Sequence, residues 1–177
     1  GAFTFLGDFM NGGRLCQYDL RREGLGGIHD WIDREGITVL NMPPPVFRNI
    51  FSNLPPGRRF ASVRVIVLSG DTMIRREVDL CRAHFNPDCG LVNMLAMSEV
   101  GLVSRHRLDL AQDTGQVIPV GTPFASVDVS IVNEAGEFLP PGQEGLIRIS
   151  TRYLSRDPRL GSNASSDIRL VLDEATG

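Results

Sequence analysis

The 177-residue sequence contains no lysine, because all 18 of its basic residues are arginines. Arginine can bind phosphate but does not titrate as lysine does, so lysine-dependent chemistry has no residue here to carry it. Cysteine is scarce as well: Cys16, Cys81 and Cys89 are odd in number and include no Cys-x-x-Cys pair. A disulfide framework or a zinc site is therefore not expected, and we interpret these residues as free thiols in a reducing cytoplasm.

Long apolar runs and concentrated positive charge are also missing. No apolar stretch approaches the roughly 18 residues of a membrane span, and we expect no secretory leader before the fold. The net charge is −3 with acidic and basic residues interspersed, which argues against a nucleic-acid-binding face. Neither Gly-x-Gly-x-x-Gly nor Gly-x-x-x-x-Gly-Lys-Ser/Thr occurs, which disfavours an unrelated doubly wound nucleotide-binding domain.

The composition that is present is that of a globular protein, 42% hydrophobic and 22% charged, long enough for one domain or two small ones. Apolar stretches predict strands at 37–41, 63–68 and 91–93. Their starts are about 26 residues apart with a helical pattern in each gap, which is typical of βαβ units and a parallel sheet. Loops at the carboxyl ends of such strands share one edge, so we expect convergence of residues 41–42, 69–71 and 93–94.

Apolar residues at helical spacing predict helices at 25–32, 46–51 and 74–85. The second helix follows three prolines, which a helix tolerates in its first turn. For the third helix, Asp71 or Thr72 is the expected N-terminal cap. Upstream of all three, residues 15–18 favour a short strand after an Asn-Gly-Gly turn.

After Gly101 the pattern changes to short alternating strands, at 127–131 and 146–150, with Gly and Pro turns between them. We therefore predict an α/β fold class, with a parallel βαβ sheet followed by a small antiparallel β-barrel subdomain. The expected domains are a partial α/β subdomain at 1–108, the barrel at 109–155 and a loosely ordered tail at 156–177.

Several stretches, taken in order, resemble the adenylate-forming superfamily, which includes nonribosomal peptide synthetase adenylation domains and acyl-CoA synthetases. One is a strand that runs into Ser-Gly-Asp-Thr-Met, another is the core Asn-Met-Leu-Ala-Met-Ser-Glu, and the last two mark the barrel. The matching stretches are residues 11–15, 35–44, 65–73, 93–99, 118–123 and 141–146. Each is weak alone, and their order and spacing make the resemblance specific over nearly all of the chain to about residue 155.

The resemblance implies an enzyme that uses Mg-ATP to convert an amino or other carboxylic acid to an acyl-adenylate. The acyl group would then pass to a thiol of pantetheine or coenzyme A, the former on a carrier protein. Ser98 would touch phosphate, as a hydroxyl can, and Glu99 would approach magnesium, for which one carboxylate plus nucleotide oxygens is a normal shell. Nucleotide-binding roles are also implied for Gly70, Asp71, Thr72, Asn93, Met94 and Leu95.

The same motif positions imply a pocket for the acyl or aminoacyl group. Most of the side chains that fall there are apolar, which favours an apolar substrate over a charged one. They are Phe3, Asn41, Val67, Ser69, Met94, Leu102 and Val103.

The resemblance places the lysine-bearing phosphate loop before residue 1, and a mobile domain with the catalytic lysine after the last residue. We therefore expect a central fragment of the enzyme that is inactive by itself. We also expect it to self-associate at edges that a neighbouring subdomain would cover.

Two alternatives stay open. Leu95, Ala96 and Leu146 depart from the family's usual aromatic residue, glycine and glutamate, which would suit a non-catalytic, degenerate domain with a structural or interaction role. Ser98 and Glu99 could also cap the start of a surface helix instead of binding a ligand.

Overall fold

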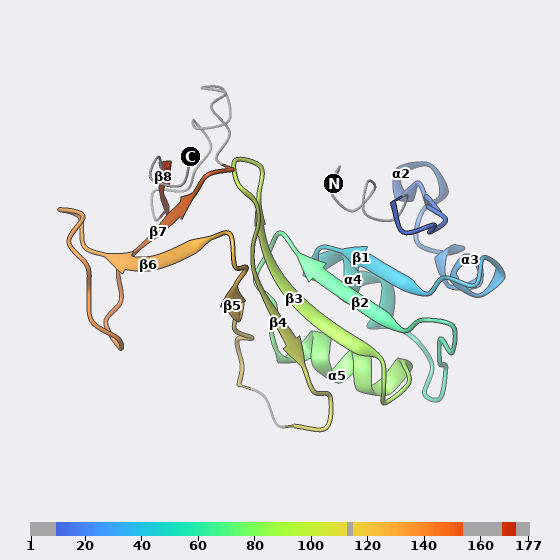
Figure 1. Cartoon of the computed structure of the whole chain (residues 1–177). Helices are drawn as coiled ribbons and strands as arrows, with labels where there is room; N and C mark the ends of the chain where they lie inside the picture. The colour runs from blue at the N-terminus through green and yellow to red at the C-terminus, as the bar shows by residue number, and fades with distance from the viewer. Residues whose placement is uncertain (1–9, 113–114, 154–167, 173–177) are drawn as a thin grey trace. The chain divides into compact units, whose positions relative to one another are not determined.

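The computed structural model describes residues 10–112, 115–153 and 168–172 (Figure 1). Its helices are α2 (Leu20–Glu23), α3 (Ile28–Arg34), α4 (Pro44–Phe51) and α5 (Arg75–His84). Its strands are β1 (Val39–Met42), β2 (Val65–Ser69), β3 (Gly90–Met97), β4 (Gly101–Leu108), β5 (Thr122–Pro123), β6 (Asp128–Val132), β7 (Leu146–Thr151) and β8 (Ile168–Leu172). This alternation confirms the predicted α/β class.

Five strands form a sheet in the order β1-β2-β3-β4-β5. β1 and β2 pair in parallel, with Val39 opposite Val65. The first three strands begin side by side, because the Arg64 amide donates to the Thr38 carbonyl at 2.8 Å and the Gly90 amide donates to the Arg64 carbonyl at 2.8 Å. Neighbouring strands that begin at one edge run in the same direction, so the predicted parallel βαβ arrangement is confirmed.

Alternation along β2 separates a buried face of the sheet from an open one. Ile66 and Leu68 are fully buried and belong to the same core cluster as Phe47 of α4. Val65 and Val67 point to the opposite face, where they are only half-buried. The helices α4 and α5 thus cover one face of these strands.

An aromatic cluster fills the core beneath the helices. The rings of Phe47, Phe51, Phe60 and Phe85 are all fully buried, and their centroids lie 4.6 to 6.0 Å apart. Burial of each such ring contributes roughly 2–3 kcal/mol. Two of the four belong to α4, which begins after Pro43 as the proline pattern predicted.

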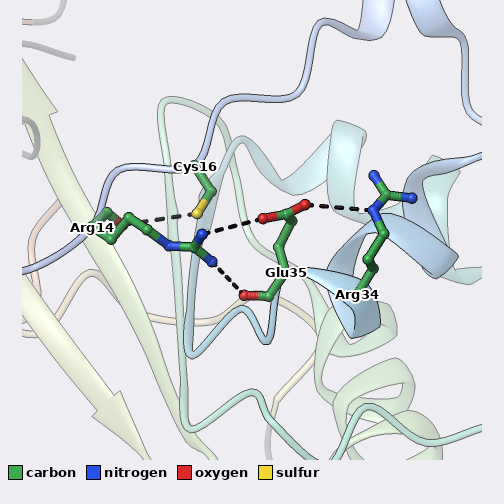
Figure 2. Close-up of polar contacts among 4 residues, drawn as sticks. All are labelled: Arg14, Cys16, Arg34 and Glu35. Carbon is green, nitrogen blue, oxygen red and sulfur yellow. Dashed lines mark hydrogen bonds and ion pairs between the residues drawn. The ribbon is translucent and has the colours of Figure 1, made fainter.

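The prediction of a strand at 15–18 is wrong, because these residues have no regular structure. Figure 2 shows what holds this segment instead: the Arg14 guanidinium donates to the Glu35 carbonyl at 2.7 Å and lies 3.3 Å from its carboxylate. The predicted helix at 25–32 begins only at Ile28, and Leu25 is exposed. Gly26 and Gly27 precede the helix, and glycine loses the most backbone freedom on entering one.

The predicted cap of α5 is also wrong. Asp71 accepts a hydrogen bond from the neighbouring Thr72 amide at 2.6 Å, so neither side chain caps the helix. Glu77 caps it instead, because its carboxylate accepts from the Ile74 amide at 2.7 Å. The predicted buried face of this helix, with Val78, Cys81 and Phe85, is confirmed.

The segment at 93–101 differs most from its prediction as a loop. β3 continues to Met97, the turn is Ser98 to Val100, and β4 begins at Gly101. Residues 94–97 contain no glycine or proline to end the strand, and the first glycine is Gly101. Asn93 and Met94 therefore lie inside β3, and the expected meeting of three loops reduces to the ends of β1 and β2.

The chain divides into two compact units. The first unit takes in the described residues up to Asn93 and from Arg107 to Pro119, and the second takes in Met94 to His106 and the described residues from Val120 onward. The chain crosses between the units after Asn93, after His106 and after Pro119. The domain boundaries expected at 108 and 155 stay a prediction.

In the second unit, β6 and β7 pair antiparallel as expected, and β8 pairs with β7 in parallel. Across the part of the chain that the structure describes, β6, β7 and β8 form an open three-stranded sheet, so the closed barrel is not confirmed. β8 lies within 156–177, so that part of the expected loose tail is a strand, and the rest of the tail lies outside the described residues.

No helix among the described residues is long and apolar enough to cross a membrane.

Candidate functional site

The loop after β2 carries three of the predicted nucleotide-binding residues. Gly70 has a φ of +92°, a conformation that side-chain-bearing residues rarely adopt, and it turns the chain away from the strand. Gly70, Asp71 and Thr72 are all exposed, and they are followed at once by the fully buried Met73. The loop therefore exposes its backbone and short polar side chains, and the buried Met73 anchors its end.

The anchor is a short antiparallel contact with residues 116–118. The Ile118 amide donates to the Met73 carbonyl at 2.9 Å, and the Arg75 amide donates to the Gln116 carbonyl at 2.9 Å. Ile74 and Val117 form a β-bridge between these two bonds. The exposed loop thus ends in a backbone ladder immediately before α5.

Asn93 lies beside this ladder and is 2% exposed. Its side-chain amide nitrogen donates to the Ile118 carbonyl at 3.0 Å and to the Pro119 carbonyl at 2.9 Å. An asparagine amide has two N–H donors, so both are engaged by the protein backbone. Sequence reasoning placed Asn93 among the nucleotide-binding residues and did not foresee these bonds.

Three of the predicted substrate-pocket residues share the open face of the first unit's strands. Asn41 and Val67 are parallel register partners, and Ser69 lies two residues further along β2 on the same side. Asn41 is exposed, and Val67 and Ser69 are half-buried. The structure therefore brings these three residues together, and their role in a substrate pocket stays a prediction.

A groove of about 1050 Å³ in the first unit is bordered by Asn41 and Ser69. Its lining also includes residues 13–18 and parts of α2, α3, β1 and α4, with Tyr18 and Trp31 among the larger side chains. Val67 is not part of that lining. The contribution of residues 13–18 was missed, because a strand had been predicted there.

In the second unit, the turn between β3 and β4 exposes Ser98 and buries Glu99, which is 7% exposed. No described residue donates a hydrogen bond to the Glu99 carboxylate, and none forms an ion pair with it. The alternative in which Ser98 and Glu99 cap a helix is wrong, because a strand follows them. The Glu99 carboxylate therefore has no partner among the described residues, and its role in holding a cation stays a prediction.

The remaining predicted residues of the second unit differ in exposure. Met94 and Leu95 are half-buried in β3, and Leu95 packs against the cluster of Val100, Val103, Val127 and Ile149. Val103 is fully buried in that cluster, and Leu102 is exposed. Adjacent strand residues point to opposite faces, so of these two neighbours Leu102 is the accessible one. Phe3 lies outside the described residues.

No group of three His, Cys, Asp or Glu side chains gathers into a metal site within 10–112, 115–153 and 168–172. A magnesium ion held by one protein carboxylate and by nucleotide oxygens needs no such group. The isolated Glu99 fits that type of site, and a cluster-type site does not arise in the described residues.

Sequence reasoning missed one buried charge. Glu77 is 0% exposed, and it pairs with Arg48 of α4 while its other oxygen caps α5. A glutamate three residues after a helix start is a capping signature, and it could have been found at Ile74 and Glu77. The pairing with Arg48 has no local signal, because 29 residues separate the partners.

The chain is similar to a family of known proteins. A family model described as "AMP-binding enzyme" matches residues 1–157. Surfactin synthase subunit 2 of Bacillus subtilis is 29% identical over 135 residues, which are 73% of this chain and 4% of that protein. Nonribosomal peptide synthetase agiA of Aspergillus flavus is 27% identical over 147 residues, which are 82% of this chain and 2% of that protein. The chain therefore spans a small part of the relatives it matches.

Solved structures share the fold at lower identity. The FmoA3 nonribosomal peptide synthetase bound to α-methyl-L-serine-AMP superposes with a TM-score of 0.66 at 21% identity, over 76% of this chain and 16% of that chain. The Vibrio cholerae adenylation domain AlmE in complex with glycyl-adenosine-5'-phosphate superposes with a TM-score of 0.64 at 22% identity, over 80% and 28%. The N-terminal subdomain of Klebsiella oxytoca NpsA gives a TM-score of 0.58 at 20% identity, over 82% and 36%.

Proposed function

The chain belongs to the AMP-binding enzyme family, and from that premise we propose that it forms part of an adenylation domain. The enzyme activates an amino or other carboxylic acid with ATP and passes the acyl group to a thiol. The match of the family model to residues 1–157 is the observation that carries the proposal. The fold alone fits other nucleotide-binding proteins equally well.

The proposed reaction has two steps. A carboxylate oxygen of the acid attacks the α-phosphorus of ATP, the bond to the bridging oxygen breaks, and pyrophosphate leaves. A thiol sulfur of pantetheine or coenzyme A then attacks the acyl carbon, and AMP leaves with the carboxylate oxygen. For a synthetase of the kind seen among the relatives, we propose a carrier protein as the bearer of the thiol.

The first unit supplies the proposed adenine-binding loop, Gly70 to Thr72. Its positive-φ glycine and exposed polar residues allow close approach of a flat base, and the ladder after Met73 holds its end. The open face with Asn41, Val67 and Ser69 is the proposed wall for the acid. These three residues contribute an amide, an apolar side chain and a hydroxyl and no charge, which favours an uncharged side chain on the substrate.

The second unit supplies the proposed phosphate and metal contacts. The exposed Ser98 hydroxyl can donate to a phosphate oxygen. The Glu99 carboxylate, which has no partner among the described residues, would hold Mg²⁺, and the ion would neutralise charge on the phosphates. Met94 and Leu95 would pack against the nucleotide and the acid, with Leu102 beside them, and Val103 would support Leu102 from the core.

Pyrophosphate exchange tests the proposal, measured on this chain and on the protein that carries it. We expect ATP-dependent exchange with an apolar amino or carboxylic acid in the carrying protein, and none with the 177 residues alone, because they contain no lysine. Exchange by the chain alone would contradict the expected dependence on outside groups. A carrying protein that folds and shows no exchange with a broad panel of acids would favour the degenerate, non-catalytic alternative.

Glu99→Gln sharpens this test, since it keeps the shape of the side chain and removes its charge. We expect a loss of about 100-fold in the exchange rate and a requirement for higher Mg²⁺. Glu137→Gln is the matched control, because that carboxylate is exposed and accepts a hydrogen bond from the side chain of nearby Asn133. Equal effects of the two substitutions would exclude Glu99 from the metal site.

The edge strand β1 also leads us to propose that the chain self-associates when it is isolated. Val39 is 48% exposed on the outer strand of the sheet, and such an edge can pair with another copy. Light scattering over a range of concentrations tests this. A mass that stays at 19.4 kDa at high concentration would contradict it.

A further inference from the structure

Asn93 was predicted as a ligand-binding residue, and its side-chain donors are committed elsewhere. One nitrogen bonds the carbonyls of two consecutive residues, Ile118 and Pro119, across 25 and 26 positions of sequence. Both bonds have ordinary lengths, at 3.0 and 2.9 Å. A side chain held in this way serves first to fix the backbone of residues 118–119.

Pro119 has no backbone N–H, so the hydrogen-bonded ladder ends there. The carbonyls of Ile118 and Pro119 therefore need donors from elsewhere in the chain. Ile118 is 3% exposed, and its buried carbonyl requires a partner. The Asn93 amide provides two N–H groups on a rigid plane and meets both carbonyls at once. Neither an aspartate, which lacks donors when ionised, nor an alanine could do the same.

The held stretch in turn fixes the base of the Gly70–Thr72 loop. Ile118 donates to the Met73 carbonyl, and Gln116 accepts from the Arg75 amide. The path therefore runs from Asn93 through Ile118 to Met73, the residue directly after the exposed loop. All of its members belong to the first unit.

We propose that Asn93 is a positioning residue of the nucleotide site, which orients the Gly70–Thr72 loop through Ile118 and Met73 by two side-chain hydrogen bonds. The nucleotide in this proposal rests on the proposed function, and the path from Asn93 to the loop rests on the hydrogen bonds described above. It gives the side-chain nitrogen of Asn93 a role in holding the base of the loop. Its loss should weaken the binding of ATP without altering the chemistry of the reacting groups.

Hydrogen exchange on the full chain tests the path without any nucleotide. In Asn93→Ala we expect the amides of Ile118 and Arg75 to exchange roughly tenfold faster or more. The Arg64 amide, which joins β2 to β1, should keep its rate. Unchanged exchange at Ile118 and Arg75 would overturn the path.

Asn86→Ala is the matched control. The Asn86 side chain also donates to a backbone carbonyl 25 residues away, that of Ala61, at 3.2 Å in the same unit. Its removal should leave the Ile118 and Arg75 amides unaffected. Asn93→Ser retains one hydroxyl donor and should give the same pattern at reduced size, so it carries the test if Asn93→Ala does not fold.

Kinetics on the protein that carries the chain test the consequence. For Asn93→Ser we expect the KM for ATP to rise roughly tenfold, with kcat and the KM for the acid changed less than about twofold. A general structural defect would move all three constants, and so would not give this split. A KM for ATP that stays constant while the Ile118 amide exchanges faster would overturn the positioning role.

The two proposals fail in different ways. If the unsubstituted protein shows no pyrophosphate exchange with any acid, the proposed function fails, and with it the nucleotide role of Asn93. The hydrogen-exchange result still decides whether Asn93 holds the loop. If exchange is present and Asn93→Ser behaves as Asn86→Ala does, the inference fails alone.

Discussion

The two units of the molecule differ in how they are held together. The first unit has a continuous core beneath its strands, with the cluster of Phe47, Phe51, Phe60 and Phe85 and a fully buried, paired Glu77. The buried cluster described for the second unit is small and aliphatic, with Val100, Val103, Val127 and Ile149. Exposed rings in the second unit lie under arginines instead, as Phe138 does under Arg148 at 5.3 Å.

This difference assigns different tasks to the two units. The first unit has enough buried apolar surface to fix the backbone that carries the Gly70–Thr72 loop. The second unit holds the proposed phosphate and metal contacts on a tight turn between two strands. We expect core substitutions in the first unit to cause global loss of structure, and substitutions in the second to act locally.

The largest effect is expected from Glu77→Ala. It leaves the half-buried Arg48 guanidinium without its partner, the Ile74 amide uncapped and a void at a fully buried position, which together should cost about 3–5 kcal/mol. Urea unfolding followed by fluorescence of Trp31 measures it, since this is the one tryptophan and it belongs to the first unit. Glu137→Ala, at an exposed position in the second unit, should shift the same transition by less than about 0.5 kcal/mol. Similar shifts for the two variants would remove the proposed contrast between the units.

The next effect is expected from Gly121→Ala in the second unit. Gly121 has a φ of +77°, and an added Cβ would lie 2.1 Å from the Arg105 carbonyl oxygen, so β4 and β5 must separate. We expect a local cost of about 3 kcal/mol or more. The readout is faster exchange of the Phe124 amide, which donates to Val103.

Gly142→Ala is the control for this substitution. Gly142 has a φ of +91° with no atom near the added Cβ, so only the backbone cost of about 1–2 kcal/mol applies. The Trp31 transition should not move in either variant. A shift of that transition with Gly121→Ala would show that the two units unfold together.

A smaller loss of stability is expected at alkaline pH, and its source is two buried cysteines of the first unit. Burial, with a smaller contribution from Asp88, raises the pKa of Cys89 to about 11, and burial raises the pKa of Cys81 well above its usual value near 9. The unfolded chain then loses these protons first, so the thiols' contribution to stability is present below pH 9 and is lost as pH rises toward 11.

For Cys89 the loss amounts to about 2 kcal/mol across this window. Urea midpoints measured from pH 8 to 11 should therefore fall, and they should fall less steeply in Cys89→Ala. Cys16→Ala should keep the slope of the unsubstituted protein. An identical slope in Cys89→Ala would assign the alkaline loss to other groups.

The smallest effect is expected from Thr151→Val in the second unit. The Thr151 hydroxyl donates to the Ser126 carbonyl at 3.0 Å and is 3% exposed, so the nearly isosteric valine leaves that carbonyl without its donor. The expected cost is about 1 kcal/mol. Exchange of the β6 and β7 amides measures it, with Ser130→Ala as a control on the same sheet. No change in Thr151→Val would show that this bond is dispensable.

Much of the candidate site was predictable where the signal is local. The apolar stretch at 63–68 predicted β2, and the break at Gly70-Asp71-Thr72 predicted the loop after it. The proline run predicted α4, and the face of Val78, Cys81 and Phe85 predicted how α5 packs. Each of these depends on neighbours within a few residues, where steric and hydrophobic periodicity act.

The failures have long-range causes. Nothing near Asn93 indicates that its amide will meet Ile118 and Pro119, and nothing near Arg48 indicates Glu77. The strand at 15–18 was expected from composition, and the Arg14 contact with Glu35 holds that segment without one (Figure 2). Such contacts depend on which elements the folded sheet brings together.

By itself, the sequence determined the positions of β1, β2, α4, α5, β6 and β7, the buried faces of β2 and α5, and the motif order that marks the family, because periodicity and turn residues act over a few positions. Only the tertiary structure decided that β3 runs to Met97, that Glu99 is buried with no partner among the described residues, and that the Asn93 amide bonds the backbone of residues 118–119. The physical reason is that a buried polar group bonds to whichever partner the folded chain brings near it. A partner many residues away leaves no signal in the local sequence.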